Sequence, residues 1–446
     1  MKIAILGAGW AGMAAAVRAT ELGAAVTLFE ASRSLGGRAR AVDATLPDGS
    51  PVLLDNGQHL LIGAYSETLG LMRQVGVDPE LALLRLPLTL KFPDGHGLQL
   101  PTWPAPWNAL AGMASAKGWG LRDKASLVRA ALGWQMRSFQ CPTSATVAEL
   151  CRKISARVLQ ELIEPLCVSA LNTPADRASG QVFLRVMQDS LFGVAGSSDL
   201  LLPRVDLSAL FPQTAAHWLH ARGARVKVGV RVESLQALNR EHGWQLEGEA
   251  FDQVIVATSA SNVASALTEL ATSHAYVQNW LQLSQALQYE AITTVYAWAA
   301  GAQLSAPMLS LRSHALQNAP AQFVFDRAQL GGPPGLLAFV VSASSDDRAT
   351  LQAQVLQQAK DQLGLNLQAV LTVVEKRATF ACTPGLQRPP MDIAPGLLAC
   401  GDYVDGPYPA TLEGAVRSGI QAANQATHQS AKASKLHNSP RSATVT

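Results

Sequence analysis

Three glycines near the start of the chain, Gly7, Gly9 and Gly12, have the G-x-G-x-x-G spacing of a loop that binds a pyrophosphate. Gly7 permits a tight turn, Gly9 lets a ligand approach the backbone, and Gly12 lets a helix pack closely on a strand. Glu30 follows the glycines by about 20 residues, where a carboxylate can accept hydrogen bonds from ribose hydroxyls. The pattern predicts a dinucleotide site; the alternative is a glycine-rich turn that arose by chance.

A second group of residues favours FAD over NAD as the dinucleotide. Gly36, Gly37 and Arg38 follow Glu30 by six to eight positions. The two glycines would bring the backbone against the cofactor a second time, and the planar guanidinium of Arg38 would offer paired donors to the pyrophosphate. NAD enzymes have no use for this second contact, so we predict FAD. The alternative is a solvated glycine turn with a surface arginine.

An unusual polar cluster, Asp55-Asn56-Gly57-Gln58-His59, stands between aliphatic residues in the stretch LLDNGQHLLIGAY. The aliphatic flanks predict burial, and buried polar groups need hydrogen-bond partners. One interpretation is that the cluster faces a ligand. The other is that Asp55 and Asn56 cap a turn, while His59 is a buried histidine whose hydrogen bonds are satisfied.

The elements that must position these residues begin with a strand–helix–strand unit at the N-terminus. A short apolar strand at 3–6 leads into the glycine loop, an alanine-rich helix runs to Leu22, and a strand at 26–29 ends at Glu30. Distant stretches predict further elements of the same domain, namely strands at 225–228, 230–235 and 253–257, a turn at 401–402 and a helix from about Thr411. A site built from both ends of the chain implies a domain that is interrupted by insertions.

Four motifs together resemble the superfamily of flavin amine oxidases and phytoene desaturases. They are the glycine loop with Glu30, the GGR of 36–38, the VESL stretch that begins at Val232 and the GD…EGAxxSG pattern of 401–419. The resemblance covers most of the chain in order. It implies an α/β fold in which a Rossmann-like FAD-binding domain of the GR2 type is interleaved with an α+β substrate-binding domain.

The same reasoning divides the chain into alternating segments. We expect the FAD-binding domain to be formed by three separate segments, at 1–63, 201–275 and 386–428. Between them we expect an inserted helical region that faces substrate or membrane at 64–200 and a substrate-domain sheet and helix at 276–385, with a disordered tail at 429–446. The alternating stretches YEAITTVYAWAA and GLLAFVVSAS predict strands in the sheet that forms the wall of the substrate cavity in relatives.

Cofactor contacts carry over from the superfamily at matching positions. In relatives the segment after GGR leads to the flavin ring, so the polar cluster would face the flavin, with Gly57 allowing close approach and Gln58 or His59 near the reactive edge. The other expected FAD contacts are Gly7, Gly9, Trp10, Ala11, Gly12, Glu30, Gly36, Gly37, Arg38, Val232, Gly401, Asp402, Thr411, Leu412 and Ala415. Ser34 departs from the basic residue that is common at its position, which affects any ion pair expected there but not the glycine contacts.

A narrower resemblance rests on LLDNGQHLLIGAYSETLGLMRQVG and GDYVDGPYPATLEGAVRSG, which are similar to stretches of the hydroxysqualene dehydroxylases of bacterial hopanoid and squalene biosynthesis. It implies a C30 isoprenoid substrate, hydroxysqualene, whose allylic hydroxyl is removed with hydride from N5 of reduced FAD to give squalene. The alternatives are a phytoene or carotenoid desaturase, a flavin amine oxidase, and a non-enzymatic prenyl-binding chaperone of the same fold. Such chaperones lose glycines or the GGR, which are intact here.

Departure of a hydroxyl group requires a proton donor near the flavin. The catalytic candidates are His59, which titrates near neutrality, Tyr408, just before the terminal helix, and Asp405, whose pKa would have to be raised by burial. Each has an alternative role: His59 as a hydrogen-bond partner of the flavin, Tyr408 as an aromatic wall, and Asp405 as a turn residue.

The stretch 100–135 in the inserted region combines tryptophans with basic residues. Trp103, Trp107, Trp119 and Trp134 accompany Leu100, Leu110, Met113 and Leu121, with Lys117, Arg122, Lys124 and Arg129 interspersed. This composition is typical of helices that lie on a membrane surface. The alternative is a helical cap packed on the domain.

The composition of the 446-residue chain limits the class of protein. With 48% hydrophobic and 15% charged residues it is globular, and a net charge of +2 argues against nucleic-acid partners. A mean hydropathy of +0.13 suggests an apolar ligand or a lipid-facing patch. Five scattered cysteines without CxxC spacing predict reduced thiols and no metal site. Since no signal peptide or membrane-spanning stretch is recognisable, we expect a cytoplasmic protein, peripheral on the inner face of the cell membrane if 100–135 contacts lipid.

Overall fold

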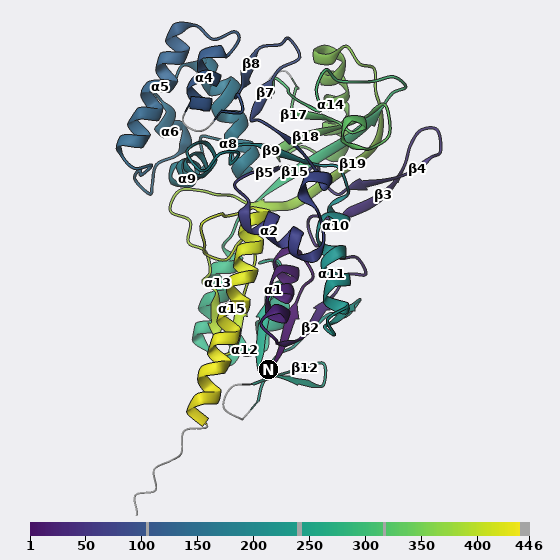
Figure 1. Ribbon diagram of the computed structural model, residues 1–446, viewed down its shortest axis with the longest axis vertical. Helices are drawn as coiled ribbons and strands as arrows, with labels where there is room; N and C mark the ends of the chain where they lie inside the picture. The colour runs from purple at the N-terminus through teal and green to yellow at the C-terminus, as the bar shows by residue number, and fades with distance from the viewer. Residues whose placement is uncertain (104–106, 239–242, 315–317, 438–446) are drawn as a thin grey trace, which may run out of the picture.

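The computed structural model describes residues 1–103, 107–238, 243–314 and 318–437. Figure 1 shows two regions, one above the other in that view. The lower, parallel-sheet region carries the first strand, β1 (Lys2–Leu6), and the last helix, α15 (Leu412–His437). The upper, antiparallel-sheet region carries β15 (Tyr289–Trp298) and its neighbours, beside a group of helices from 107–191.

The sheet of the parallel-sheet region has the strand order β10-β2-β1-β14-β21-β20. Its other strands are β2 (Ala25–Glu30), β10 (Arg225–Val228), β14 (Gln253–Val256), β20 (Asp392–Ala394) and β21 (Leu397–Ala399). All neighbours are parallel except β20 and β21, which pair antiparallel at one edge. Stretches of chain that are distant in sequence therefore meet in one sheet, which confirms the predicted fold class.

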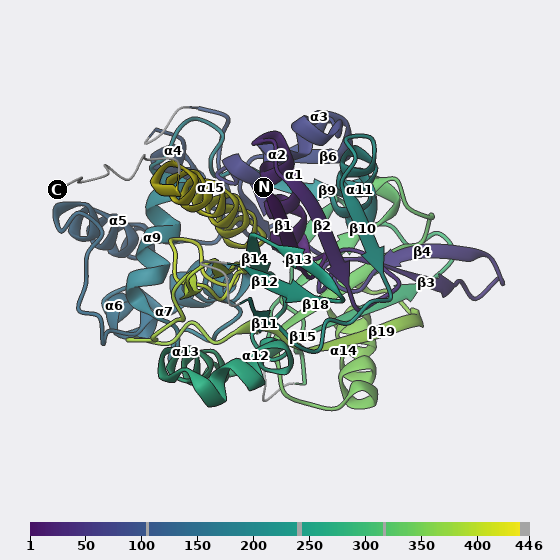
Figure 2. The ribbon, with the colours of Figure 1, turned by 90° about the horizontal axis from the view of Figure 1, so that it is seen from below.

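The helix α1 (Trp10–Glu21) follows β1 through the glycine loop and is covered by α15 (Figure 2). A Cβ on Gly419 of α15 would lie 2.2 Å from the carbonyl oxygen of Ala11, so the two helices touch backbone to backbone at this point. The central strand β1 is buried from Ile3 onward because parallel sheets are covered on both faces. This burial explains the continuous apolar run at the start of the chain.

The sheet of the antiparallel-sheet region has the order β16-β17-β18-β15-β19. Its strands besides β15 are β16 (Met308–Ser310), β17 (Phe323–Asp326), β18 (Leu336–Ser344) and β19 (Gln368–Phe380). Side chains alternate across it. Val295 and Ala297 of β15 pack with Val355 of helix α14 (Arg348–Leu363), whereas Ile292 and Val340 face a cavity on the other side. Both predicted cavity-wall strands, β15 and β18, are present.

The helices beside the antiparallel sheet carry an internal clamp. Glu161 is buried in a π-helical turn and accepts hydrogen bonds from Trp119 Nε1 at 2.8 Å and from Arg312 at 3.0 Å. Arg312 also donates to Asp94 at 2.7 Å.

The chain between residues 61 and 203 forms α2 (Ser66–Val75), α3 (Pro79–Ala82), α4 (Trp107–Ser115), α5 (Leu121–Met136), α6 (Val147–Cys151), α7 (Ala156–Val158), the π-helix Leu159–Ile163, α8 (Glu164–Leu171), α9 (Gly180–Leu191), β5 (Leu61–Ile62), β6 (Leu83–Leu86), β7 (Thr89–Lys91), β8 (Gly97–Gln99) and β9 (Leu200–Pro203).

A two-stranded hairpin, β3 (Ala41–Thr45) and β4 (Pro51–Asp55), projects from the body of the molecule in Figures 1 and 2. Its base leads into the polar cluster. The remaining elements are α10 (Leu207–Leu210), α11 (Pro212–His220), β11 (Gln236–Ala237), β12 (Trp244–Leu246), β13 (Glu249–Phe251), α12 (Val263–Ser273), α13 (Ala275–Gln285) and a 3₁₀ turn at Ala328–Leu330.

Two predictions about elements were wrong. Within the described chain, 230–235 forms no strand, and its residues Arg231 and Val232 line the cavity instead of pairing with a neighbour. The chain is helical through His437, so 429–437 is not the tail that the sequence predicted; the alanines, lysines and leucine there favour helix. The rest of the predicted tail, 438–446, lies outside the described residues.

Candidate active site

A cavity of about 600 Å³ extends from the parallel sheet to the antiparallel sheet. One end lies at the carboxyl ends of β1, β2 and β14, the edge at which open α/β sheets bind ligands. Every predicted cofactor contact lines the cavity except Gly12, which packs beneath Gly7.

The glycine loop gives its glycines distinct roles. Gly7 has a φ of +108°, which L residues rarely adopt, and a Cβ on Gly12 would lie 1.9 Å from the carbonyl oxygen of Gly7. A Cβ on Gly9 would meet no protein atom within 4 Å, although Gly9 lines the cavity. Space is therefore left beside Gly9 at the N-terminus of α1, where the helix dipole favours a phosphate.

Glu30 and the second glycine pair pack against this loop. The Glu30 carboxylate accepts hydrogen bonds from the N–H groups of Ala8 at 2.7 Å and Ser32 at 2.8 Å, which hold it beside the loop with further lone pairs available to a ribose. Gly36 donates to the carbonyl of Ala8 at 2.9 Å, and a Cβ on Gly37 would lie 3.3 Å from the loop's second glycine. The second glycine pair thus lies directly against the first loop, beside the cavity.

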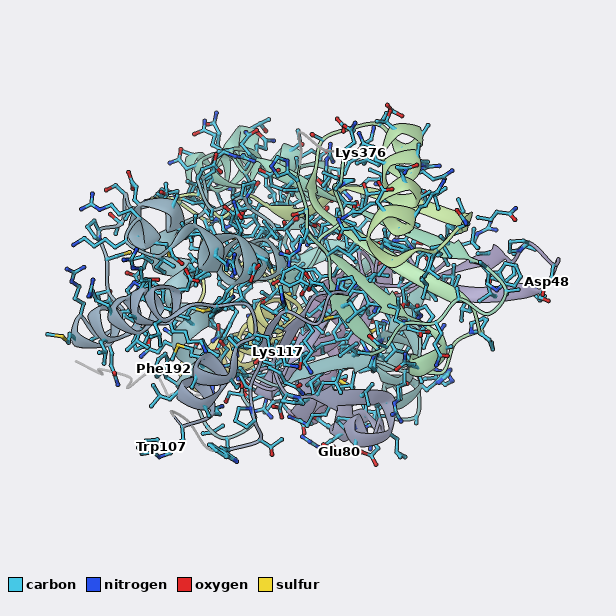
Figure 3. All side chains as sticks on the ribbon, turned by 90° about the horizontal axis from the view of Figure 1, so that it is seen from above. Asp48, Glu80, Trp107, Lys117, Phe192 and Lys376 are labelled. Atoms are coloured by element: carbon cyan, nitrogen blue, oxygen red, sulfur yellow. The ribbon has the colours of Figure 1, made fainter. Side chains whose placement is uncertain are left out.

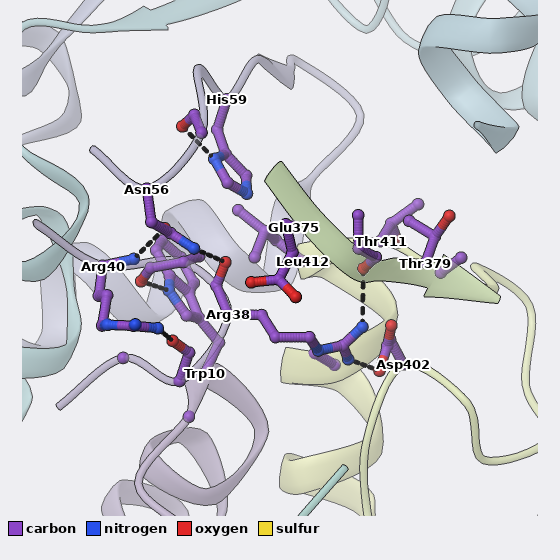
Figure 4. A pocket seen from close by; sticks show the side chains of 18 of the residues that line it. Trp10, Arg38, Arg40, Asn56, His59, Glu375, Thr379, Asp402, Thr411 and Leu412 are labelled. Carbon is purple, nitrogen blue, oxygen red and sulfur yellow. Dashed lines mark hydrogen bonds and ion pairs between the residues drawn. The ribbon is translucent and has the colours of Figure 1, made fainter. Parts of the chain in front are cut away.

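Arg38 joins the two ends of the chain. Its guanidinium donates to Asp402 Oδ1 at 2.5 Å and to the carbonyl of Ala378 at 2.8 Å, and Arg38 and Asp402 both face the cavity (Figure 4). The last helix begins shortly after Asp402, and Thr411 Oγ1 accepts a hydrogen bond from the N–H of Gly414 at 2.9 Å, as an N-cap does.

Glu413 anchors the start of α15. Its carboxylate is fully buried and accepts hydrogen bonds from the N–H of Glu67 at 3.1 Å, the N–H of Thr68 at 2.9 Å and the hydroxyl of Thr68 at 2.6 Å. It also pairs with Arg417 at 2.7 Å. Glu67 and Thr68 lie in the first turn of α2, so one carboxylate holds two helix N-termini together and fixes the cavity wall at Leu412.

Asp55 and Asn56, the first two residues of the polar cluster, bond to the scaffold. Asp55 Oδ1 accepts a hydrogen bond from the N–H of Leu207 at 2.8 Å, and burial raises its pKa to about 6 against the lowering effect of that bond. The Asn56 amide accepts from the N–H of Arg40 at 3.0 Å and donates to the carbonyl of Arg38 at 2.9 Å. Asp55 therefore holds the cluster to the start of α10, and Asn56 joins it to the backbone of 38–40 while it also lines the cavity.

Gln58 and His59 instead present their side chains to the cavity. His59 Nδ1 lies 2.8 Å from the carbonyl oxygen of Gly57, which can only accept, so Nδ1 carries the proton and Nε2 is left for the cavity (Figure 4). Burial lowers the pKa of His59, and the charge of Arg38 lowers it further. The lowered pKa favours the uncharged ring, in which Nε2 is an acceptor.

Asp405 and Tyr408 do not line the cavity, which corrects the prediction that they lie near the flavin. The Asp405 side chain is 73% exposed and pairs with Arg388 at 3.1 Å. The ring of Tyr408 lies 4.9 Å from the guanidinium carbon of Arg417. His59 is the one predicted catalytic residue that lines the cavity.

Two buried hydroxyls test whether the residues fit a cofactor. Thr258 Oγ1 and the Tyr403 hydroxyl have no hydrogen-bond partner among the described residues, and both residues line the cavity. Buried polar groups of this kind need a partner. Together with the space beside Gly9, they fit a bound FAD. Sequence reasoning missed Thr258, although its place two residues after β14, at the carboxyl edge of the sheet, could have indicated it.

The far end of the cavity is apolar. Its walls come from β7, α8, β16, β17 and β18, through Leu90, Leu166, Met308, Phe325 and Val340. A long hydrocarbon suits such walls because they exclude water and offer no hydrogen bonds.

The described residues offer neither a metal cluster nor a bilayer-crossing element. No group of three or more His, Cys, Asp or Glu side chains in that portion of the chain could hold a metal ion. None of the helices in the described chain is both long and apolar enough to span a membrane.

The fold and the cavity define the class of protein, an FAD-dependent oxidoreductase. Residues 10–427 match the family model of flavin containing amine oxidoreductases, and the chain belongs to that family. The match leaves out β1, Gly7 and Gly9 but includes the other predicted cofactor contacts and the whole apolar wall.

Relatives that match over nearly the whole chain are named for a more specific activity than the family is. The chain is 28% identical to the hydroxysqualene dehydroxylase of Rhodopseudomonas palustris over 94% of this chain and 97% of that protein. It is 25% identical to the hydroxysqualene dehydroxylase of Zymomonas mobilis over 96% of this chain and 99% of that protein. These similarities confirm the narrower resemblance found in the sequence.

Solved structures confirm the fold. An oxidoreductase from Methanosarcina mazei has a TM-score of 0.70 at 16% identity, over 95% of this chain and 100% of that one. Cyclohexylamine oxidase from Brevibacterium oxydans has a TM-score of 0.63 at 16% identity, over 96% of this chain and 99% of that one.

Proposed function

We propose that this enzyme reductively removes the allylic hydroxyl of hydroxysqualene and forms squalene. The observation that carries the proposal is the continuity of an apolar cavity with the cofactor end at two polar side chains, Gln58 and His59. The full-length relatives named hydroxysqualene dehydroxylase support the same substrate. The C–O bond breaks, the oxygen leaves as water with one added proton, and a C–H bond forms.

Reduced FAD would supply the hydride for the new C–H bond. The chain's own residues bind and orient the substrate: Leu166 and Phe325 hold the hydrocarbon and keep water from the developing cation. Nε2 of His59 can accept a hydrogen bond from the substrate hydroxyl. The lowered pKa makes the imidazolium a minor form of His59, and in that form the same atom would donate the proton that the departing oxygen needs.

The decisive experiment is an anaerobic single turnover. Reduced enzyme is mixed with detergent-dispersed hydroxysqualene, the absorbance of oxidised flavin is followed, and extracted lipids are analysed by mass spectrometry. We expect squalene to form in equal amount to reoxidised flavin. If reduced enzyme ignores hydroxysqualene while oxidised enzyme desaturates a carotenoid precursor, the desaturase alternative holds instead.

We propose in addition that α4 rests on the membrane from which the substrate is drawn. Trp103, Trp107 and Leu110 are 58%, 64% and 43% exposed, and Trp107 and Leu110 share one face of α4 at a spacing of three residues. Figure 3 shows Trp107 at the edge of the molecule. By contrast, Trp119 and Trp134 are buried and belong to the core, so the lipid contact falls to the beginning of 100–135.

A further inference from the structure

The most unusual charge in the antiparallel-sheet region is the guanidinium of Arg327. It follows β17 and is 6% exposed, yet no carboxylate among the described residues lies within salt-bridge distance of it. Its side chain donates instead to Gln58 Oε1 at 3.0 Å, in a bond that is buried. The nearby Asp55 carboxyl, whose pKa the charge of Arg327 acts to lower, lies beyond salt-bridge distance. Because a buried cation is costly unless it is well bonded, the hydrogen bond to Gln58 matters for Arg327.

The contact fixes the orientation of the Gln58 amide. A guanidinium can only donate, so the oxygen of the amide must face Arg327. The nitrogen, Nε2, donates to the carbonyl of His59 at 3.2 Å, and a carbonyl can only accept. The N–H of Gln58 is also held, by Thr294 Oγ1 at 3.2 Å. Partners at both ends therefore prevent the amide from flipping.

One hydrogen of Gln58 Nε2 remains. Among the residues that the structure describes, Nε2 has no second acceptor within hydrogen-bond distance, and Gln58 lines the cavity where its apolar and cofactor ends meet. The neighbouring His59 presents an acceptor there, as described above. The junction thus offers a donor beside an acceptor, which is the arrangement that recognises a hydroxyl group, since a hydroxyl both accepts and donates.

We propose that Arg327 is a positioning residue that makes Gln58 a fixed donor to the hydroxyl oxygen of an isoprenoid alcohol. The cavity then distinguishes the alcohol from the hydrocarbon of the same length, because a plain hydrocarbon leaves the buried N–H unpaired. This inference rests on the proposed function, in that the alcohol is taken to be the substrate. It adds the pair of residues that selects the alcohol before any bond is broken.

The test measures binding to oxidised holoenzyme, which cannot reduce the substrate. Quenching of the flavin fluorescence is titrated with hydroxysqualene and with squalene in the same detergent. We expect wild-type enzyme to prefer the alcohol by about tenfold, in line with one or two hydrogen bonds. Gln58→Glu keeps an acceptor for Arg327 but loses the donor, and we expect it to abolish most of the preference.

Substitutions of Arg327 separate positioning from packing. Arg327→Met removes the donor that holds the amide and should also reduce the preference, whereas Arg327→Lys keeps one donor and should restore most of it. Arg312→Met is the matched control, since it removes an arginine of the clamp outside the cavity and should leave the preference unchanged. If Arg327→Met does not fold, Gln58→Glu decides the matter.

An unchanged preference in Gln58→Glu, or a loss of preference in Arg312→Met as large as that in Arg327→Met, overturns the proposal. Its failure can be told apart from failure of the proposed function. Wild-type enzyme that converts hydroxysqualene but binds both ligands equally refutes the role of Arg327 alone. Wild-type enzyme that never converts hydroxysqualene refutes the function.

Discussion

The parallel-sheet region and the antiparallel-sheet region prepare the same cavity in different ways. In the parallel-sheet region, backbone groups and glycines form most of the cavity: Gly9 leaves open space, and Glu30 is held by two N–H groups. In the second, side chains from separate strands and helices form an apolar wall, and a few polar groups interrupt it at Gln58 and His59.

The difference teaches how each ligand is recognised. A dinucleotide is recognised by short motifs whose residues are close in sequence, because phosphate and ribose need donors and acceptors at fixed spacing. A hydrocarbon offers only shape, so its site is assembled from distant residues such as Leu90, Leu166 and Val340. Substitutions that affect one ligand and spare the other test this division.

The largest expected effect is on cofactor binding. Gly9→Ala places a methyl where no protein atom lies within 4 Å, so the fold should be retained while the methyl occupies the space of the pyrophosphate. We expect the affinity for FAD to fall by on the order of 100-fold, with an unchanged apo-protein Tm. Equilibrium titration of apo-protein with FAD measures it. Gly70→Ala is the matched control, since Gly70 of α2 also has open space but lies outside the cavity; equal FAD affinity in both variants would refute the assignment.

The reciprocal effect belongs to the apolar wall. Ala170→Phe adds a ring to the face of α8 that lines the cavity. We expect turnover of hydroxysqualene to fall by roughly 30-fold because the hydrocarbon loses its space, while bound flavin stays stoichiometric. Flavin content and single-turnover rates check both halves of the statement. Ala349→Phe, on the exposed side of α14, is the control and should change neither the flavin content nor the turnover rate. Loss of flavin from Ala170→Phe would contradict the proposal that the two regions bind separate ligands.

A smaller effect concerns Asp55, which lies between the two regions and whose pKa is raised from 3.8 to about 6 by burial. Between these values the folded state binds more protons than the unfolded state, so the wild-type protein loses stability as pH rises through this window. Asp55→Asn keeps the oxygen that Leu207 needs and removes the titration. From pH 5 to pH 7 the variant should gain about 1 kcal/mol relative to wild type.

Urea unfolding at both pH values measures this gain. Asp48→Asn, at the exposed tip of the hairpin, is the control and should show no gain, because its pKa is lowered by bonds to Ser50 rather than raised by burial. Parallel pH profiles for Asp55→Asn and wild type would show that burial does not disfavour the charged form of Asp55.

The smallest expected effect is on membrane contact. Trp107→Ser removes one exposed ring from α4, and partition into anionic lipid vesicles should fall about threefold. Tyr276→Ser removes a ring of 49% exposure from α13 and should leave partition unchanged. Vesicle co-sedimentation compares the two. Equal losses would place the lipid contact elsewhere and extend it to the parallel-sheet region.

Much of the parallel-sheet region could be predicted from the sequence because its signals are local. The glycine loop, the GGR stretch and the start of α15 each depend on residues within one turn or one helix. The pairs that complete the site could not be predicted. Arg38 with Asp402 and Gln58 with Arg327 are brought together by the fold, and no periodicity in the sequence relates them.

The sequence pattern alone also could not predict which of these side chains are buried. The tryptophans of 100–135 look alike in the sequence, but Trp119 donates to Glu161 in the core while Trp107 is exposed. Asp405 and Tyr408 stand close to the last helix in sequence, yet neither lines the cavity; Asp405 pairs with Arg388, and Tyr408 lies beside Arg417. In each case a partner from a distant element or turn decides where the side chain lies.

The split of one sheet between the two ends of the chain has a consequence for biosynthesis. Strand β21, Asp402 and the start of α15 leave the ribosome after the other strands of both sheets, so the cofactor cannot be held firmly until this segment has been made. Until then the apolar cavity wall is made but not closed over its cofactor. The nascent chain therefore exposes apolar surface during this interval, which is the condition that chaperones relieve, and the supply of FAD in the cell affects how soon the interval ends.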